Sequence, residues 1–256
     1  MLLLFPVLAF LPTLIYLAAA LLPAIILLRY VYRHDTVEPE PKGLLVSLLV
    51  MGCLSALCSG VLEAVADAFL SVAVEPGSRL YTVLLAFLVV AVVEEGTKLI
   101  FLKLRSWNHP AFNYRFDGVV YAVFVSLGFA ALENVQYVNN YGLSVALPRA
   151  LLAIPGHLSF SIYMGMYYGR ARLQANLGDR EGARRSLRTG YLIAVFLHGF
   201  YDTCAMLQSG LSTIVFLVFV ILMFANAYRT LKRESATDTP ITPPDEGPNG
   251  PPVIPL

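Results

Sequence analysis

The stretch Val92-Val93-Glu94-Glu95-Gly96-Thr97-Lys98-Leu99 lies within an otherwise apolar run from Leu80 to Leu102. A charged side chain at the centre of a membrane helix costs roughly 2.5 to 3.5 kcal/mol on insertion scales, so three neighbouring charges require compensating partners. On a helix, Lys98 follows Glu94 by four residues and Glu95 by three, so its ammonium can reach either carboxylate. The stretch therefore predicts a polar site inside a membrane helix.

The composition of the whole chain agrees with that prediction. Hydrophobic residues make up 57% of the chain and charged residues only 14%, whereas about 25% of an ordinary soluble domain is charged. The apolar residues come in long blocks, which predicts an all-α polytopic helix bundle in the cell membrane, surrounded by lipid bilayer. The net charge of +1 and the absence of a single basic patch exclude nucleic acid as a partner.

Seven apolar segments are predicted to span the membrane, since a span needs roughly 20 residues. Residues 1–234 then form one transmembrane helical domain, and residues 235–256, rich in proline and glycine, are expected to be a disordered cytoplasmic tail. Glu63 and Asp67, near the end of the second span, are expected at a solvated edge. The predicted spans are approximately residues 2–28, 43–70, 80–102, 117–137, 147–168, 191–207 and 211–228.

The distribution of basic residues predicts the orientation of these spans. Nearly all lysines and arginines fall in the connections after the first, third, fifth and seventh spans, including a strongly basic connection at residues 170–188. The opposite connections hold only Arg79 and Arg149. Cytoplasmic loops carry the excess of basic residues, so we expect an external amino terminus and a cytoplasmic carboxyl terminus.

Ionisable residues occur inside four successive spans. His198 and Asp202 are four residues apart, so on a helix the carboxylate can orient the imidazole. Such a collection is expensive in a membrane and predicts a functional site. Its members are Glu94, Glu95 and Lys98 on the third span, Glu133 on the fourth, His157 on the fifth, and His198 with Asp202 on the sixth.

Five motifs follow one another along the chain: Glu94-Glu95-x-x-Lys98, Asp117-Gly118-Val-Val-Tyr121, Gly128-Phe129-Ala130-x-x-Glu133-Asn134-x-x-Tyr137, His157 and His198-x-x-x-Asp202. In this order they resemble the motifs of the PrsW family of intramembrane proteases, distant relatives of the CAAX prenyl endopeptidases. They place a protease-like core at about residues 80–208. The resemblance implies hydrolysis of a peptide bond in a membrane-anchored protein substrate, which in the namesake branch is an anti-sigma factor.

Two mechanisms can be built from these residues. In the first, Glu94 or Glu95 is the base that activates water, the other glutamate pairs with Lys98, and His198 or Asn134 donates to the oxyanion. In the second, Glu133, His157 and His198 hold a divalent metal, most simply zinc, and Glu94 or Glu95 activates the bound water. The sequence has no HExxH helix, so its spacing alone does not choose between the two mechanisms.

Depth along the helices sets one further expectation. At about 1.5 Å per residue from the cytoplasmic helix ends, Lys98 lies roughly 6 Å deep and Glu133 roughly 24 Å deep. This count places Lys98 below the chemistry, as electrostatic support, and separates Glu133 from the other residues. If the fourth span begins near Tyr121 instead, Glu133 lies at about 18 Å and within reach of them. Two other classes of function use the same charges: a proton- or ion-coupled transporter, for which repeated halves are expected, and a non-catalytic membrane scaffold held by structural ion pairs.

Overall fold

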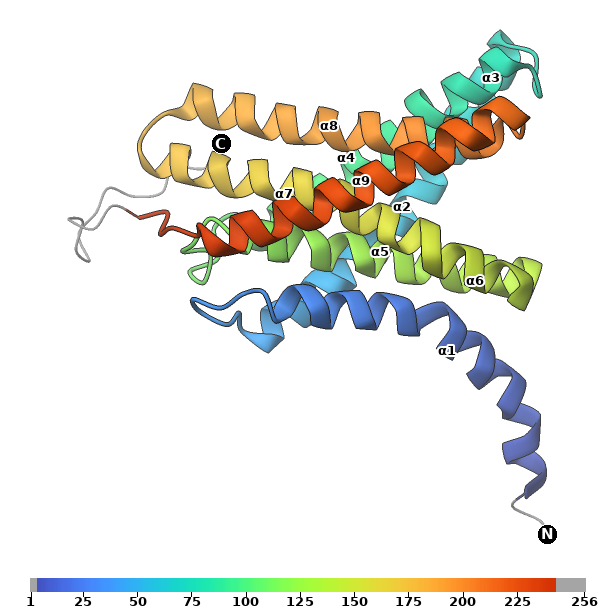
Figure 1. Ribbon diagram of the computed structural model, residues 1–256, viewed down its shortest axis with the longest axis horizontal. Helices are drawn as coiled ribbons and strands as arrows, with labels where there is room; N and C mark the ends of the chain where they lie inside the picture. The colour runs from blue at the N-terminus through green and yellow to red at the C-terminus, as the bar shows by residue number, and fades with distance from the viewer. Residues whose placement is uncertain (1–3, 243–256) are drawn as a thin grey trace.

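The computed structural model of the protein describes residues 4–242, with side chains from residue 13 onward, and these residues form a bundle of helices (Figure 1). The all-α prediction is confirmed, because the described residues form seven long helical segments. Five of the segments are single helices: α1 (Leu4–Tyr32), α2 (Lys42–Ala73), α5 (Asp117–Tyr141), α8 (Arg180–Met206) and α9 (Gly210–Ala236). The third segment runs through α3 (Arg79–Leu84), η1 (Leu85–Ala91) and α4 (Val92–Ser106). The fifth segment runs through η2 (Leu143–Val145), α6 (Ala146–Pro148), η3 (Arg149–Ala153) and α7 (Ile154–Asn176).

Helix α5 lies at the centre of the bundle. It contacts α1, α2, α4 and α7, and all of its residues from Asp117 to Ala130 are buried. After Asp117, the sequence of this stretch is apolar, aromatic or small on every face, which is the pattern of a helix surrounded by other helices. Since Glu133 follows this buried stretch on the same helix, α5 carries that carboxylate into the interior of the bundle.

Small residues allow the neighbours of α5 to approach closely. A Cβ atom at Gly52 of α2 would meet the backbone carbonyl of Val125, and one at Gly128 of α5 would meet the carbonyl of Leu49. Gly165 and Gly169 of α7 pack in the same way against the first turns of α5. Small residues at such interfaces let helix backbones come together in membranes. Gly52 of α2 and the Gly165 and Gly169 pair of α7 therefore lie on packing faces.

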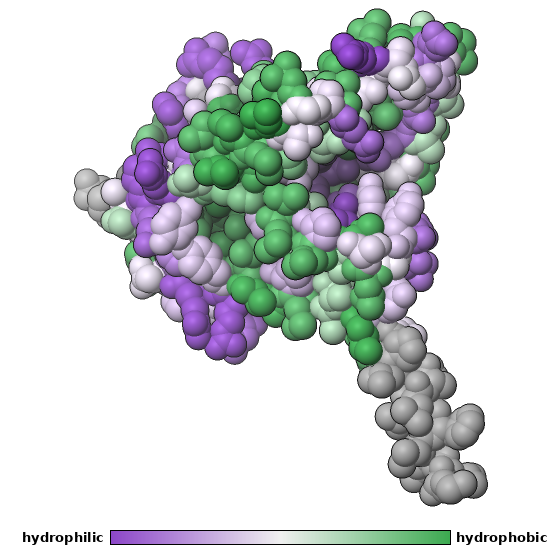
Figure 2. Space-filling model, turned by 45° about the vertical axis from the view of Figure 1, so that its right-hand side comes forward, coloured by the Kyte–Doolittle hydropathy of each residue, from purple (hydrophilic) through white to green (hydrophobic). Residues whose placement is uncertain are grey.

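Five stretches are long and apolar enough to cross a membrane: Thr13–Tyr32, Lys42–Ala73, Asp117–Tyr141, Leu143–Asn176 and Gly210–Ala236. On the face shown in Figure 2, hydrophobic side chains form a broad band and hydrophilic residues gather toward its edges. Many large apolar residues are exposed on these helices, among them Val61 and Phe69 of α2 and Ile221 of α9. Such a surface suits contact with lipid, and the protein is a multi-pass membrane protein.

The structure differs from the predicted connection at residues 170–188. Helix α7 continues to Asn176 and α8 begins at Arg180, so only three residues join the two helices. The two helices run side by side as an antiparallel pair (Figure 1). The basic residues of this stretch extend the helices beyond their apolar portions, because arginine is a good helix former and all of these side chains except the buried Arg172 are exposed.

The predicted start of the tail also differs from the structure. Helix α9 ends at Ala236, and the residues after it pack onto the connection between α4 and α5. The amide of Arg115 donates to the carbonyl of Thr239, and the amide of Ile241 donates to that of Asn113. Ile241 is fully buried, and burial of this apolar side chain outweighs the local proline content. Residues 243–256, the rest of the predicted tail, lie outside the described residues.

Candidate active site

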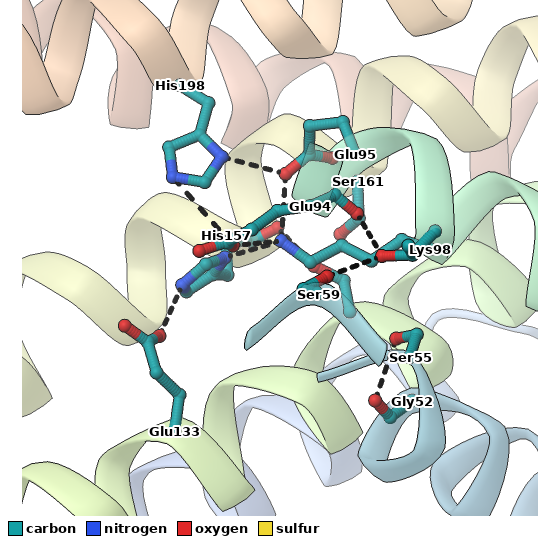
Figure 3. A network of polar contacts seen from close by, with 12 residues as sticks. Gly52, Ser55, Ser59, Glu94, Glu95, Lys98, Glu133, His157, Ser161 and His198 are labelled. Atoms are coloured by element: carbon teal, nitrogen blue, oxygen red, sulfur yellow. Dashed lines mark hydrogen bonds and ion pairs between the residues drawn. The ribbon is translucent and has the colours of Figure 1, made fainter. Parts of the chain in front are cut away.

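Three charged side chains of α4 form the centre of the site (Figure 3). The ammonium of Lys98 lies 3.0 Å from Oε2 of Glu94 and 2.8 Å from Oε1 of Glu95. All three residues are buried, so each charge depends on the others for the interactions it would otherwise make with water. Gly96 and Thr97 complete the turn, and the Thr97 hydroxyl bonds to Ser59 of α2 at 2.7 Å, which fixes α4 against α2.

His157 of α7 connects this centre to α5. Its Nδ1 lies 3.2 Å from the Lys98 ammonium, and its Nε2 lies 3.0 Å from Oε2 of Glu133. The same Glu133 oxygen lies 2.9 Å from Nη2 of Arg149. An ionised carboxylate can only accept hydrogen bonds, so Nε2 of His157 is the protonated nitrogen. The lone pair of Nδ1 therefore faces the centre.

His198 of α8 repeats this arrangement from the opposite side. Its Nδ1 lies 2.9 Å from Oε1 of Glu95, and its Nε2 lies 3.3 Å from Oδ2 of Asp202. The ring of Phe160 stacks on the imidazole with the ring centroids 4.8 Å apart. Each histidine thus has its Nε2 on an outer carboxylate and its Nδ1 toward the glutamate pair. Carboxylates placed in this way fix the orientation and tautomer of the imidazole.

An open cavity of about 740 Å³ borders the cluster. Glu94 lines it, whereas Glu95 is fully buried behind. A cavity of this size can admit a segment of polypeptide chain to the carboxylate. Its polar lining consists of Ser59, Glu63, Glu94, Glu133, Gln136, Tyr137, Arg149, His157, His198, Tyr201, Asp202, Gln208 and Thr213.

Wide helical turns precede the site residues on two segments. The π-helical segment η1 runs directly into α4 and its glutamate pair, and η3 runs directly into α7 and His157. A π-turn changes the face on which the following side chains lie and is frequent at functional sites. The Tyr191 hydroxyl of α8 donates to the carbonyl of Val92 at 3.0 Å, which joins α8 to the first turn of α4.

The same centre has the donor chemistry of a metal site. Glu94, Glu95 and His157 each offer one donor atom, and the three atoms lie within 4.8 Å of one another. Oε2 of Glu95 is buried without a hydrogen-bond partner among the described residues. Two carboxylates and an imidazole whose Nδ1 lone pair faces them are ligands that divalent metals accept. These residues therefore fit a metal ion.

Comparison with known proteins agrees with this geometry. Residues 40–226 match the family model described as PrsW family intramembrane metalloprotease. The chain belongs to the PrsW family. It is 33% identical to Protease PrsW of Geobacillus kaustophilus over 72% of this chain and 77% of that protein, and 30% identical to Protease PrsW of Oceanobacillus iheyensis over 85% and 94%. Protease PrsW of Bacillus subtilis is 31% identical over 72% and 80%. No solved structure matches the chain.

Membership of the PrsW family decides between the classes of function that the sequence left open. The protein is an intramembrane protease of a family described as metalloproteases, and neither a transporter nor a scaffold accounts for that match. The resemblance deduced from the separated motifs is confirmed. The model of the PrsW family also covers α2 and most of α9, beyond the core predicted at about residues 80–208.

Three predicted site residues have surroundings in this PrsW protein that differ from those expected. The Lys98 ammonium lies at the centre of the cluster and not below it. Glu133 reaches His157 directly, because the helices are inclined to one another and depth along separate helices is not comparable. The Asn134 amide donates to the carbonyl of Ala20, and its oxygen accepts from Arg149. Asn134 thus joins helices and is not available as an oxyanion donor.

Two further polar residues of the cavity were missed or misplaced by sequence reasoning. Arg149 lines the cavity, contacts Glu133 and lies 3.8 Å over the ring of Tyr137. In the sequence, Arg149 was distinguished only by its position. It is one of the two basic residues in the connections that lack an excess of lysine and arginine. Glu63 lines the cavity, although a solvated edge was expected, while Asp67 accepts a hydrogen bond from the Tyr81 hydroxyl.

Proposed function

We propose that this PrsW family protease cleaves a membrane-anchored protein, with Glu94 as the base that activates water. One observation carries the proposal: Glu94 lines the cavity, and its carboxylate is bonded to Lys98 through one oxygen, Oε2. Glu95 is bonded to Lys98 and His198 and is fully buried. This arrangement favours Glu94 as the chemical group and Glu95 as its support. The anti-sigma factors of the namesake branch exemplify the substrate class.

His198 is proposed as the acid that protonates the leaving amine. It lines the cavity, and its Nε2 lies 4.0 Å from Oε2 of Glu94. Asp202 and Glu95 contact its two nitrogens and stabilise the protonated imidazole. A proton taken from water by Glu94 thus has a short path to the nitrogen of the scissile bond. General acid–base transfer of this kind contributes typically about 10²- to 10⁴-fold to a rate.

The metal of the family is proposed to be zinc, held by Glu94, Glu95 and His157. We propose this set in place of the expected set of Glu133, His157 and His198. Glu133 contacts Nε2 of His157, the ring nitrogen that faces away from the glutamate pair, and the corresponding Nε2 of His198 contacts Asp202. When bound, the ion supplies a Lewis acid and an activated water. Glu133 and Asp202 would orient the two imidazoles, and the second oxygen of Glu94 would be free to accept a proton from water.

Cleavage of a model single-span membrane substrate by the purified protein in liposomes tests this proposal. We expect Glu94→Gln and His198→Ala each to lower the cleavage rate at least 100-fold, because one removes the base and the other the acid. Glu75→Gln is the matched control, since Glu75 is exposed between α2 and α3. Thermal melting shows that each variant is folded. Unchanged cleavage by both site variants would overturn the assignment.

We also propose that all seven long segments cross the membrane, with the amino terminus outside. The basic residues at the α7–α8 junction and at the end of α9 support a cytoplasmic location for those ends. The cavity lining includes Arg149, Gln208 and Thr213, which lie toward the opposite ends of the helices, so the site would open outward. A reporter that folds only in the cytoplasm, fused after residue 256, should be active. An inactive cytoplasmic reporter together with an active exported one would reverse the orientation.

A further inference from the structure

The ammonium of Lys98 is enclosed on four sides by groups that bind cations. Besides the two glutamate oxygens at 3.0 and 2.8 Å, it lies 3.2 Å from Nδ1 of His157 and 3.9 Å from the centre of the Phe129 ring. The residue is 2% exposed. Carboxylates, an imidazole lone pair and an aromatic face all stabilise a positive charge. The four groups come from α4, α5 and α7, so the cage is made by the tertiary fold.

Three members of this cage are also the residues that fit a metal ion. The donor atoms of Glu94, Glu95 and His157 lie within 4.8 Å of one another, and the Lys98 ammonium lies within 3.2 Å of an atom of each. Metal–ligand distances to nitrogen and oxygen are about 2.0 to 2.2 Å for zinc. A metal ion bound to all three residues would therefore need the space that the ammonium fills.

We infer that Lys98 is a resident cation that competes with the metal ion for the cage of Glu94, Glu95, His157 and Phe129. This inference rests on the proposed function, because it takes these donors to be the metal ligands. Lysine suits the role, since its ammonium is a compact charge on a flexible four-carbon stem that can withdraw without movement of the backbone. The lysine would keep the two glutamates together until the ion arrives and would set how tightly the ion binds.

If Lys98 had a purely structural role, its removal would be expected to have the opposite effect on metal binding. If Lys98 only orients the glutamates, its removal disorders the ligands and weakens metal binding. If Lys98 competes with the ion, its removal frees the ligands and strengthens metal binding, while the protein without metal loses the positive charge that neutralises two buried carboxylates. Metal affinity and the stability of the metal-free protein together distinguish the two cases.

The test is calorimetric titration of zinc ion into the purified, chelator-treated full-length protein. We expect Lys98→Met to bind zinc at least tenfold more tightly than the wild type. Lys98→Arg, which keeps a larger cation in the cage, should bind zinc at least as weakly as the wild type. Lys103→Met is the matched control on the same helix and should leave zinc affinity unchanged. Zinc affinity of Lys98→Met equal to or below that of the wild type would overturn the inference.

Thermal melting provides a second readout that does not depend on catalysis. Without zinc, Lys98→Met should melt at a lower temperature than the wild type, and saturating zinc should raise its melting temperature more than it raises that of the wild type. If Lys98→Met does not fold, Lys98→Gln, which keeps a hydrogen-bond donor, takes its place. Absence of zinc binding by every form would overturn the inference, whereas substrate cleavage by the same wild-type sample would leave the protease assignment standing.

Discussion

One oxygen of Glu133 receives two contacts. Oε2 lies 3.0 Å from Nε2 of His157 and 2.9 Å from Nη2 of Arg149. Nε of Arg149 also donates to Asn134 at 2.7 Å, so the guanidinium is fixed on α5. Arg149 is thus a positioning residue: it holds Glu133 against His157, and Glu133 in turn orients the Nδ1 lone pair toward the glutamate pair.

Removal of this guanidinium should slow catalysis without loss of the fold. We expect Arg149→Met to lower kcat about 10- to 100-fold with little change in KM, which is typical for loss of a residue that orients a ligand. Arg149→Lys should retain part of the activity, and added guanidinium ion should restore part of the activity of Arg149→Met. The measurement is steady-state cleavage of the model substrate.

Arg79→Met is the matched control for this prediction. Arg79 is the other arginine in the connections without a basic excess and is exposed at the start of α3. Its substitution should leave kcat unchanged. Full activity of Arg149→Met, or an equal loss in the Arg79 variant, would contradict a positioning role for Arg149.

Among the helices, α2 shows how the role of a small residue depends on its neighbour. Gly52, Ala56 and Gly60 lie at intervals of four residues. A Cβ atom at Gly52 would meet the backbone of α5, whereas a Cβ atom at Gly60 would meet nothing within 4 Å. The repeated spacing in the sequence is the same at both glycines, but only Gly52 lies where α2 and α5 are closest.

Alanine substitutions at these two glycines should therefore have opposite effects. Gly52→Ala forces the two helix backbones apart and should lower the free energy of unfolding by about 1 to 3 kcal/mol. Gly60→Ala adds a methyl group in open space and should leave stability unchanged or raise it by up to about 1 kcal/mol, because alanine favours the helix. Denaturant unfolding of the detergent-solubilised variants measures both. A Gly52→Ala protein as stable as the wild type would show that α2 can move without cost.

Across the whole molecule, the connection between α1 and α2 meets the start of α5 and the segment after α9. Burial raises the pKa of Glu40 to about 7, and burial together with the charge of nearby Asp238 raises the pKa of Asp35 to about 6. The Tyr121 hydroxyl lies 2.6 Å from Oε2 of Glu40 and 3.0 Å from the carbonyl of Ala111. A hydroxyl has one proton, so a protonated Glu40 can donate to it while it donates to Ala111.

This cluster should make the protein less stable as the pH rises. The folded state keeps a proton on Glu40 up to about pH 7, whereas the unfolded chain loses it near 4.5. The stabilisation is thus complete below the unfolded pKa and is lost as the pH rises through the folded one. Between pH 5 and pH 8 we expect a loss of about 1 to 2 kcal/mol, discounted for screening by nearby water.

Denaturant unfolding at the two pH values measures this effect. Glu40→Gln keeps the hydrogen-bonding shape without ionisation and should reduce the difference between pH 5 and pH 8. The matched control is Glu75→Gln, since Glu75 is exposed between α2 and α3 and lies outside this cluster. It should behave as the wild type does. A Glu40→Gln protein with the full pH dependence of the wild type would assign the effect to other groups.

The class of fold, the family and most members of the proposed site could be predicted from the amino-acid sequence. Apolar blocks of bilayer length predict membrane helices because unpaired backbone groups are not tolerated in hydrocarbon. Ionisable residues inside those blocks are expensive, so Glu94, Glu95, His157 and His198 stood out without any structure. The pairing of His198 with Asp202 followed from helical spacing alone.

The contacts among those residues could not be predicted from the sequence, because they depend on how the helices pack. Helix inclination and the π-turns of η1 and η3 are not encoded in a simple periodicity, so depth counted along each helix misplaced Glu133 and Lys98. The structure brought Arg149 and Glu63 to the cavity from segments far apart in the chain. It also separated the two glutamates, because Glu94 lines the cavity whereas Glu95 lies behind it in contact with His198 of α8.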